Sequence, residues 1–348
     1  MAHLRGYKAA GGFVVAAVAD LIPQRRAALA TEAGASVKPY TSADELIADK
    51  SLDAVSICLP THLHLPTALA AFKKQKHVVI ETPPALSSRE TARLSSAATK
   101  AGKLLAYAFQ RRFGGAELAS QQVVDKGYIG DAHHVRASWM RTRGIPAGTG
   151  WYSEKEKSGG GALIDLGLPL LDLSWNLLGR PKPLSVLAIT KSLFRELVPA
   201  DRPYDVEDFA IATFSFEGGK TLELSCSWAT NQAPAQNGTA CRVFGSKGAV
   251  EVYTPAGPML YRNFDAKGEA KATPLKLPKV VGHAAMLRQF RECILGKTTP
   301  AVDGEQAVNL MRMVEAAYQS AANGKSAAVR VPEDAAETAE PEELPAGT

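Results

Sequence analysis

Short apolar runs alternate with amphipathic segments over roughly the first third of the chain. The apolar runs, each of strand length, are 13–20, 52–60, 76–81 and 103–109. Between them, apolar residues recur at helical spacing in the segments 23–34, 65–75 and 87–102. Strands that alternate with helices in this way form βαβ units. This part of the chain is therefore predicted to be an α/β domain with a doubly wound, parallel sheet.

One of these runs, "HVVIETPPAL" (77–86), indicates where a ligand would bind. Its three consecutive apolar residues, Val78 to Ile80, are typical of a strand that is buried on both faces. Glu81 and Thr82 follow at its carboxyl end, before two prolines end the strand. In open α/β sheets ligands bind at this edge, so polar residues that follow the strands are the first candidates for a site.

The pattern changes from about residue 130 onward. Longer strand-like segments separated by Gly turns appear, and 208–229 and 241–253 each read as a hairpin. Two helical segments, near 283–296 and 304–323, complete the pattern. We expect a second, α+β domain here, with a mainly antiparallel sheet and helices on one face. The predicted parts are an α/β domain (1–112), an α+β domain (113–330) and a disordered acidic tail (331–348).

Charge and composition restrict the class of protein. The net charge is +5 over 348 residues, and the last 18 residues contain six acidic and no basic ones, which leaves +11 for the rest. The Lys and Arg residues are scattered rather than clustered, which argues against a nucleic-acid partner. No apolar run reaches the roughly 18 residues that span a bilayer, and no signal peptide is recognisable, so a cytoplasmic protein is expected. The four cysteines form no CxxC pair, so no metal site is predicted.

The beginning of the α/β pattern lacks one expected part. A dinucleotide-binding unit starts with a strand and a Gly-rich turn whose amides face the pyrophosphate. Here a helix starts almost at Met1, with no strand or GxGxxG before it, while Asp20 lies at the end of a strand, where an acid reaches the ribose hydroxyls. Either the first residue of the protein was assigned too far along the chain, or the chain lacks the Gly-rich turn that would bind the pyrophosphate. The residues leave both possibilities open.

Several stretches, taken in order, resemble the glucose–fructose oxidoreductase / inositol dehydrogenase / rhizopine-catabolism (Gfo/Idh/MocA) family. They are "VVAAVAD" (14–20), "DAVSICLPTHLHLPTALAAFKKQKHVVIETP" (53–83), "AFQRRF" (108–113), "GGGALIDLGLPLLD" (159–172) and "VEDFA" (206–210). The resemblance implies that 1–112 is a dinucleotide-binding, Rossmann-like domain and that 113–330 is a substrate and oligomerisation domain. The second domain would have an open-faced, mainly antiparallel sheet that mediates homodimers or homotetramers. It also implies NAD or NADP as cofactor and a sugar or polyol as substrate.

The sequence departs from the family pattern at two positions. Where the family has Glu-Lys-Pro, this chain has Thr82 in place of the Lys, and Pro169 stands where a His follows Asp165 by four residues. A positioned base contributes typically 10²–10⁴-fold to such a reaction, and neither threonine nor proline can serve as one unaided. Pro169 also lacks the N–H that would bond the carbonyl of Asp165, so we expect an irregular helix there.

The resemblance and the strand ends together give a set of candidate site residues. The catalytic candidates are Asp165, Thr82 and Tyr152. The cofactor-binding candidates are Asp20, Pro60, Thr61, His64, Glu81 and Gln110. The substrate-binding candidates are Arg111, Trp151 and again Asp165, while Arg112 is expected to form a salt bridge between the domains.

Two functions from different classes follow. The first is an NAD(P)-dependent oxidoreductase that acts on a sugar-like or polyol substrate, or on an activated double bond, with altered acid–base residues. Asp20 favours NAD, although Arg25 and Arg26 leave NADP possible. The alternative is a non-catalytic nucleotide- or sugar-binding or regulatory subunit of the same fold, which the loss of two catalytic positions would explain.

Overall fold

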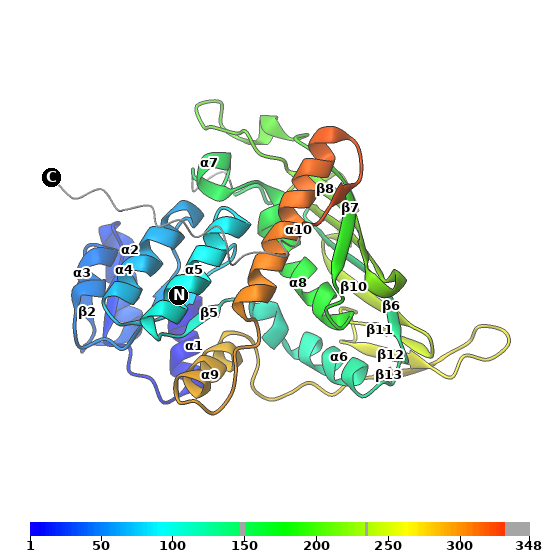
Figure 1. Ribbon diagram of the computed structural model, residues 1–348, viewed down its shortest axis with the longest axis horizontal. Coiled ribbons are helices and arrows are strands. Elements are labelled where there is room, and N and C mark those ends of the chain that lie inside the picture. Colours follow the sequence, from blue (N-terminus) through cyan, green and yellow to red (C-terminus); the bar gives the residue numbers. More distant parts are fainter. Residues whose placement is uncertain (147–149, 234–235, 331–348) are drawn as a thin grey trace.

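A computed structural model describes residues 1–146, 150–233 and 236–330. The tail 331–348, for which disorder was predicted, lies outside the described residues. Figure 1 shows an N-terminal α/β domain on one side, a large sheet on the other, and helices between them. No described helix has both the length and the apolar character needed to cross a bilayer.

The N-terminal domain has short parallel strands, as the sequence predicted. They are β1 (Ala17–Ala19), β2 (Lys38–Tyr40), β3 (Ala54–Ile57), β4 (His77–Ile80) and β5 (Leu105–Tyr107). Strands β1 and β2 pair in one parallel sheet, and β3, β4 and β5 pair in another. Within the described residues no strand joins the two sheets. Strand β2 was missed because its sequence, Lys-Pro-Tyr, is polar and contains a proline.

Helices cover both faces of the β3–β5 sheet. The domain's helices are α1 (Ala2–Ala10), α2 (Pro23–Ala33), α3 (Ala43–Ala48), α4 (His64–Lys73) and α5 (Ser88–Ala101), with 3₁₀ turns Thr61–Leu63 and Gln110–Phe113. Val78 and Ile80 of β4 pack into the main core, whereas Val79 packs into a second core with Ala10 of α1 and Phe290 of α9 (Gly282–Ile294). The strand is thus buried on both faces, as its sequence indicated.

The C-terminal domain is built on a nine-stranded sheet with the order β13-β12-β11-β10-β6-β9-β8-β7-β14. Its strands are β6 (Ala132–Met140), β7 (Pro183–Lys191), β8 (Phe209–Phe216), β9 (Thr221–Ser227), β10 (Gly238–Gly245), β11 (Gly248–Glu251), β12 (Met259–Arg262), β13 (Lys271–Pro274) and β14 (Ala327–Ala328). The β6–β9 pair is parallel and the other pairs are antiparallel. Both predicted hairpins, β8–β9 and β10–β11, are confirmed.

Helices lie on the face of this sheet that is turned toward the N-terminal domain (Figure 1). They are α6 (Gly115–Asp125), α8 (Leu168–Leu177) and α10 (Gly304–Asn323), with a π-helical turn Leu163–Gly167. The domain also contains the short helix α7 (Lys155–Ser158) and the 3₁₀ turns Arg195–Leu197 and Glu217–Gly219, the last of which connects β8 to β9. Helix α10 packs on both β7 and α5, so it joins the two domains. The last-but-one helix, α9, packs on α1 rather than on the large sheet.

Candidate active site

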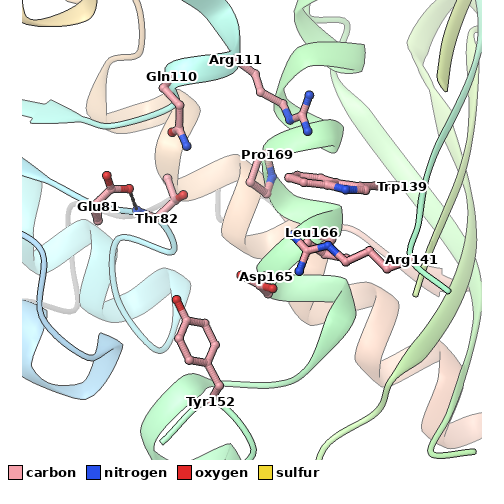
Figure 2. A pocket seen from close by; sticks show the side chains of 10 residues that line it. All are labelled: Glu81, Thr82, Gln110, Arg111, Trp139, Arg141, Tyr152, Asp165, Leu166 and Pro169. Carbon is pink, nitrogen blue, oxygen red and sulfur yellow. Dashed lines mark hydrogen bonds between the residues drawn. The ribbon is translucent and has the colours of Figure 1, made fainter. Parts of the chain in front are cut away.

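A cavity of about 350 Å³ lies where the strand ends of the N-terminal domain meet the C-terminal domain. Its lining residues, drawn in Figure 2, are Glu81, Thr82, Gln110, Arg111, Trp139, Arg141, Tyr152, Asp165, Leu166 and Pro169. Six of them were sequence candidates: the pairs that follow β4 and β5 come from one domain, and Tyr152 and Asp165 come from the other. The prediction that polar residues at the carboxyl ends of parallel strands gather at one site therefore agrees with the structure.

Asp165 is held in place by the glycine run that precedes it. The buried carboxylate of Glu207 accepts hydrogen bonds from the backbone N–H groups of Gly161 (3.0 Å) and Leu163 (2.9 Å), at the start of the turn that carries Asp165. A Cβ atom on Gly161 would lie 1.8 Å from the carbonyl oxygen of Glu207. The close backbone approach therefore requires glycine, and Glu207 of the "VEDFA" stretch is a positioning residue.

The expected irregularity at Pro169 is present. Residues 163–167 form a π-helical turn in which the N–H of Leu168 bonds the carbonyl oxygen of Leu163, and α8 begins directly afterwards with Pro169 in its first turn. A proline is tolerated in a helix's first turn, where its missing N–H has no intrahelical partner anyway. The proline thus helps to set the end of the turn from which Asp165 enters the cavity.

The Asp165 carboxyl group is a buried acid with one strong hydrogen bond. Trp228 Nε1 donates to its Oδ2 at 2.7 Å, which leaves Oδ1 for a ligand. Burial raises the pKa of Asp165 above its ordinary value, although the Trp228 hydrogen bond and the nearby Arg141 charge act in the opposite direction. A carboxyl group whose pKa is moved toward neutrality can both take and return a proton.

Glu81 is held by a residue that sequence reasoning missed. His3, in the first turn of α1, contacts Glu81 Oε1 through Nε2 at 2.7 Å, and its Nδ1 lies 3.0 Å from the hydroxyl of Ser56. Burial by itself would lower the pKa of His3, but hydrogen bonds with Cys58 and Glu81 raise it to about 10. Burial would raise the pKa of Glu81, but His3 and the N–H of Thr82 bring it below its ordinary value. The two side chains thus form an ion pair.

His3, Cys58 and Glu81 also bring three possible metal-ligand atoms within 4.8 Å of one another, although cysteine spacing had predicted no metal site. Because Nε2 of His3 and Oε1 of Glu81 already share a hydrogen bond, the contacts are those of an ion pair. The sequence offers one signal for a role of His3: it stands in the first turn of a predicted helix. That turn lies at the same edge of the sheet as the carboxyl ends of the strands.

The two aromatic candidates play different parts. Tyr152 lines the cavity, and burial together with the charges of Asp165 and Glu81 raises its pKa to about 12. Trp151 does not line the cavity; its ring stacks on Tyr152 with centroids 3.8 Å apart. The structure therefore gives Trp151 a supporting position rather than the direct substrate contact that the sequence suggested.

The other cofactor candidates lie along the sheet edge, outside this cavity. Asp20 follows β1, and its Oδ1 accepts the N–H of Ile22 at 2.8 Å. Pro60 and Thr61 follow β3, and the buried Thr61 Oγ1 has no hydrogen-bond partner among the described residues. His64 is buried with its ring nitrogens 2.9 and 2.8 Å from the carbonyl oxygens of Pro83 and Leu59, so it ties together the loops after β4 and β3.

Arg112 forms the predicted salt bridge between the domains. Its guanidinium lies 2.6 Å from Asp172 of α8, and both side chains are buried. It also donates to the carbonyl oxygen of Ala301 (2.7 Å) and to Gln306 Oε1 (2.9 Å) near the start of α10. The strand ends and the helix that follows Asp165 are thereby fixed relative to each other.

Besides Leu166, the cavity residues Trp139 and Arg141 were not anticipated. Trp139 lies near the end of β6 and Arg141 directly follows the strand, so in the sequence both read as ordinary strand residues. The guanidinium groups of Arg111 and Arg141 lie 4.0 and 5.1 Å from the Trp139 ring centroid, and Figure 2 shows them on either side of the indole. The three side chains form what we call the cationic wall of the cavity.

Comparison with known proteins places this architecture in a family. Residues 1–109 match the model of an oxidoreductase family with an NAD-binding Rossmann fold, and residues 118–251 match the GFO/IDH/MocA C-terminal domain. Among solved structures, levoglucosan dehydrogenase in complex with NADH and levoglucosan shares the fold with a TM-score of 0.82, at 20% identity over 94% of this chain and 95% of that one. The structure of GenD2 from gentamicin A biosynthesis, in complex with NAD, has a TM-score of 0.78 to this chain. The two are 24% identical, and the match covers 95% of this chain and 93% of that one.

Curated relatives match at the sequence level. D-glucoside 3-dehydrogenase of Escherichia coli (strain K12) is 32% identical over 284 residues, which cover 78% of each chain. 1,5-Anhydro-D-fructose reductase of Ensifer adhaerens is 27% identical over 329 residues, or 92% of each chain. With both halves of the chain matched by family models and a relative above 30% identity, this protein belongs to the GFO/IDH/MocA oxidoreductase family.

Proposed function

We propose that this protein is an NAD(P)-dependent oxidoreductase that interconverts a hydroxyl and a carbonyl group of a sugar or polyol. The observation that carries the proposal is Asp165, a buried carboxyl with a raised pKa that enters a cavity flanked by the strand ends of a Rossmann-like domain. The relatives named above, which act on a D-glucoside and on an anhydro sugar, support the substrate class.

The residues present fit a nicotinamide cofactor along the sheet edge. Thr61 Oγ1 and Gln110 Oε1 are buried polar atoms without a partner in the described residues, as expected of groups that bind a polar ligand. We assign Asp20 to the ribose hydroxyls, which favours NAD over NADP. Pro60, Thr61, His64, Glu81 and Gln110 would contact or support the rest of the cofactor. When bound, the nicotinamide supplies or accepts the hydride.

In the proposed mechanism, Asp165 handles the proton of the reacting hydroxyl. Oδ2 is fixed by Trp228, so Oδ1 takes the proton during oxidation and returns it during reduction. Thr82 can orient the same hydroxyl by a hydrogen bond but cannot act as base. With its pKa raised to about 12, Tyr152 keeps its proton at neutral pH and serves as a hydrogen-bond donor to the substrate.

A second function, a non-catalytic nucleotide- or sugar-binding subunit, is favoured by one specific observation. Thr82 and Pro169 both line the cavity at positions where the family pattern places Lys and His. If Asp165 does not replace them, the cavity would bind its ligand without turnover. The two functions differ in whether hydride is transferred.

The first experiment is a fluorescence titration of the chain with NADH and NADPH, followed by an absorbance assay of hydride transfer against sugars, polyols and conjugated carbonyl compounds. We expect saturable nucleotide binding, and turnover that Asp165→Asn lowers by about 10²–10⁴-fold. The matched control is Asp131→Asn, an acid that is 70% exposed and paired with Lys220, which should leave turnover unchanged. Nucleotide binding without turnover of any substrate would instead support the binding subunit. A folded protein that binds neither nucleotide would contradict the oxidoreductase.

A further inference from the structure

We propose that the substrate of this cavity carries an anionic group, a carboxylate or a phosphate ester, which binds to the cationic wall of Arg111, Trp139 and Arg141. This inference rests on the proposed function and names the substrate class of the same site. It goes beyond the sugar class, because it predicts which sugars the cavity selects.

The geometry of the wall suits an anion. Both guanidinium groups are within about 5 Å of the Trp139 ring centroid, at 4.0 and 5.1 Å, which holds their planes in place by cation–π contact. Figure 2 shows both groups beside the open space of the cavity, one on each side of the indole. An indole edge carries positive partial charge, so the surface between the two arginines attracts a negative group.

Among the charged groups of the cavity, one cation has no ion-pair partner in the described residues. Arg111 lies 3.8 Å from Glu117 and donates to the hydroxyls of Tyr253 (2.8 Å) and Thr239 (3.3 Å). Glu81 is paired with His3. For Arg141, by contrast, the described part of the chain provides no side-chain hydrogen bond and no ion pair; its contact is with Trp139.

Asp165 lies near Arg141 but does not pair with it. The charge of Arg141 is close enough to lower the pKa of Asp165, yet Oδ2 of Asp165 accepts the hydrogen bond from Trp228, and no ion pair within 4.0 Å joins Asp165 to Arg141 in the described residues. A partly buried cation is costly to leave unpaired, and a planar guanidinium binds carboxylate or phosphate oxygens through two parallel hydrogen bonds. An anionic sugar would satisfy Arg141, whereas a neutral sugar would not.

Calorimetric titrations with matched sugars test this. The probes are D-glucose, D-glucuronate and D-glucose 6-phosphate, and the corresponding galactose set, each added to the full chain with NADH present. We expect one anionic form to bind at least about tenfold more tightly than its neutral parent, as for a charge-assisted hydrogen bond, and the preference to weaken as salt is raised. A preference for the uronate identifies a carboxylate ligand, and a preference for the 6-phosphate identifies a phosphate ester.

Arg141→Gln should abolish the preference for the anion. The control is Arg136→Gln, on the same strand but paired with Glu223 and 63% exposed, which should keep it. Equal binding of neutral and anionic forms, a preference that survives in Arg141→Gln, or binding of none of the probes would overturn the inference. Hydride transfer is measured in parallel. Turnover of neutral sugars without a preference for anionic ones refutes this inference alone. Anion binding that depends on Arg141, without turnover of any sugar, refutes the proposed oxidoreductase alone.

Discussion

At the scale of single residues, the proposed chemistry depends on how the environment sets the pKa of Asp165. Burial raises it, while the hydrogen bond from Trp228 Nε1 stabilises the charged form and lowers it. Oxidation of an alcohol needs the carboxylate form, so its rate should rise with pH through the pKa of Asp165. The acidic limb of the rate profile therefore reports on this carboxyl group.

Trp228→Phe should move that acidic limb to higher pH. The substitution removes the donor that stabilises the carboxylate, so the pKa of Asp165 rises further and more of the enzyme is protonated at a given pH. The measurement is kcat/KM against pH. Trp175→Phe is the control, because Trp175 is also buried but bonds the carbonyl oxygen of Pro181 instead, and it should leave the limb in place. A limb that stays or moves to lower pH in Trp228→Phe would refute the role of Asp165 as base.

At the scale of elements, the buried pair of Arg112 and Asp172 links the loop after β5 to α8. Asp172 is fully buried and Arg112 has a side-chain exposure of 4%, so neither charge is compensated by solvent. Removing one partner of such a pair leaves an uncompensated buried charge. Because α8 directly follows the π-helical turn of Asp165, this contact fixes the catalytic candidate relative to the strand ends.

Asp172→Asn should lower the free energy of unfolding by about 3–5 kcal/mol. Urea denaturation, monitored by tryptophan fluorescence, measures the free energy of unfolding. The control is Asp131→Asn, which breaks an exposed ion pair and should lower that free energy by about 1 kcal/mol or less. The double change Arg112→Met with Asp172→Leu should cost less than Asp172→Asn alone, because it removes both charges. Equal losses for Asp172→Asn and Asp131→Asn would show that the pair does not hold the elements together.

At the scale of the whole molecule, one face of the large sheet carries exposed apolar side chains. Leu187, Ile189 and Ile211, on the adjacent strands β7 and β8, are 53%, 54% and 45% exposed. Large apolar groups gathered on one open face are typical of an interaction surface. We propose that a second copy of this chain covers them, in the homodimer or homotetramer that the family resemblance implied.

Leu187→Glu should convert the assembly to a monomer, because it would bury a charge in the apolar interface. Light scattering coupled to size-exclusion chromatography would then give 36.9 kDa, the mass of one chain, where the unmodified protein gives a multiple of it. Leu295→Glu is the control: Leu295 is also apolar and 57% exposed, but it follows α9 and lies outside the β7–β8 face, so assembly should be unchanged. A monomeric unmodified protein would contradict the proposed interface.

Much of the fold follows from local sequence. Alternating apolar runs and helical periodicity are properties of neighbouring residues. This is why four of the five parallel strands of the N-terminal domain, the two hairpins and the terminal helices were predicted within a few residues of their observed bounds. The same logic located Glu81, Thr82, Gln110 and Arg111, because residues that follow parallel strands must meet at one edge. The interruption near Pro169 was predictable too, since a missing N–H is a property of the residue itself.

The environment of these residues depends on contacts between distant parts of the chain. Trp228 is 63 residues from the Asp165 that it bonds, and His3 is 78 residues from Glu81. Such pairs have no local pattern, because they arise only when β9, α1 and the strand ends pack together. For the same reason two members of the cationic wall, Trp139 and Arg141, were missed. Arg141 reads as a strand-end residue until the packing of the two domains places it beside Trp139, Asp165 and the cavity. Periodicity thus specifies the elements and their polar ends, while long-range packing sets the charge and pKa of the groups that they present.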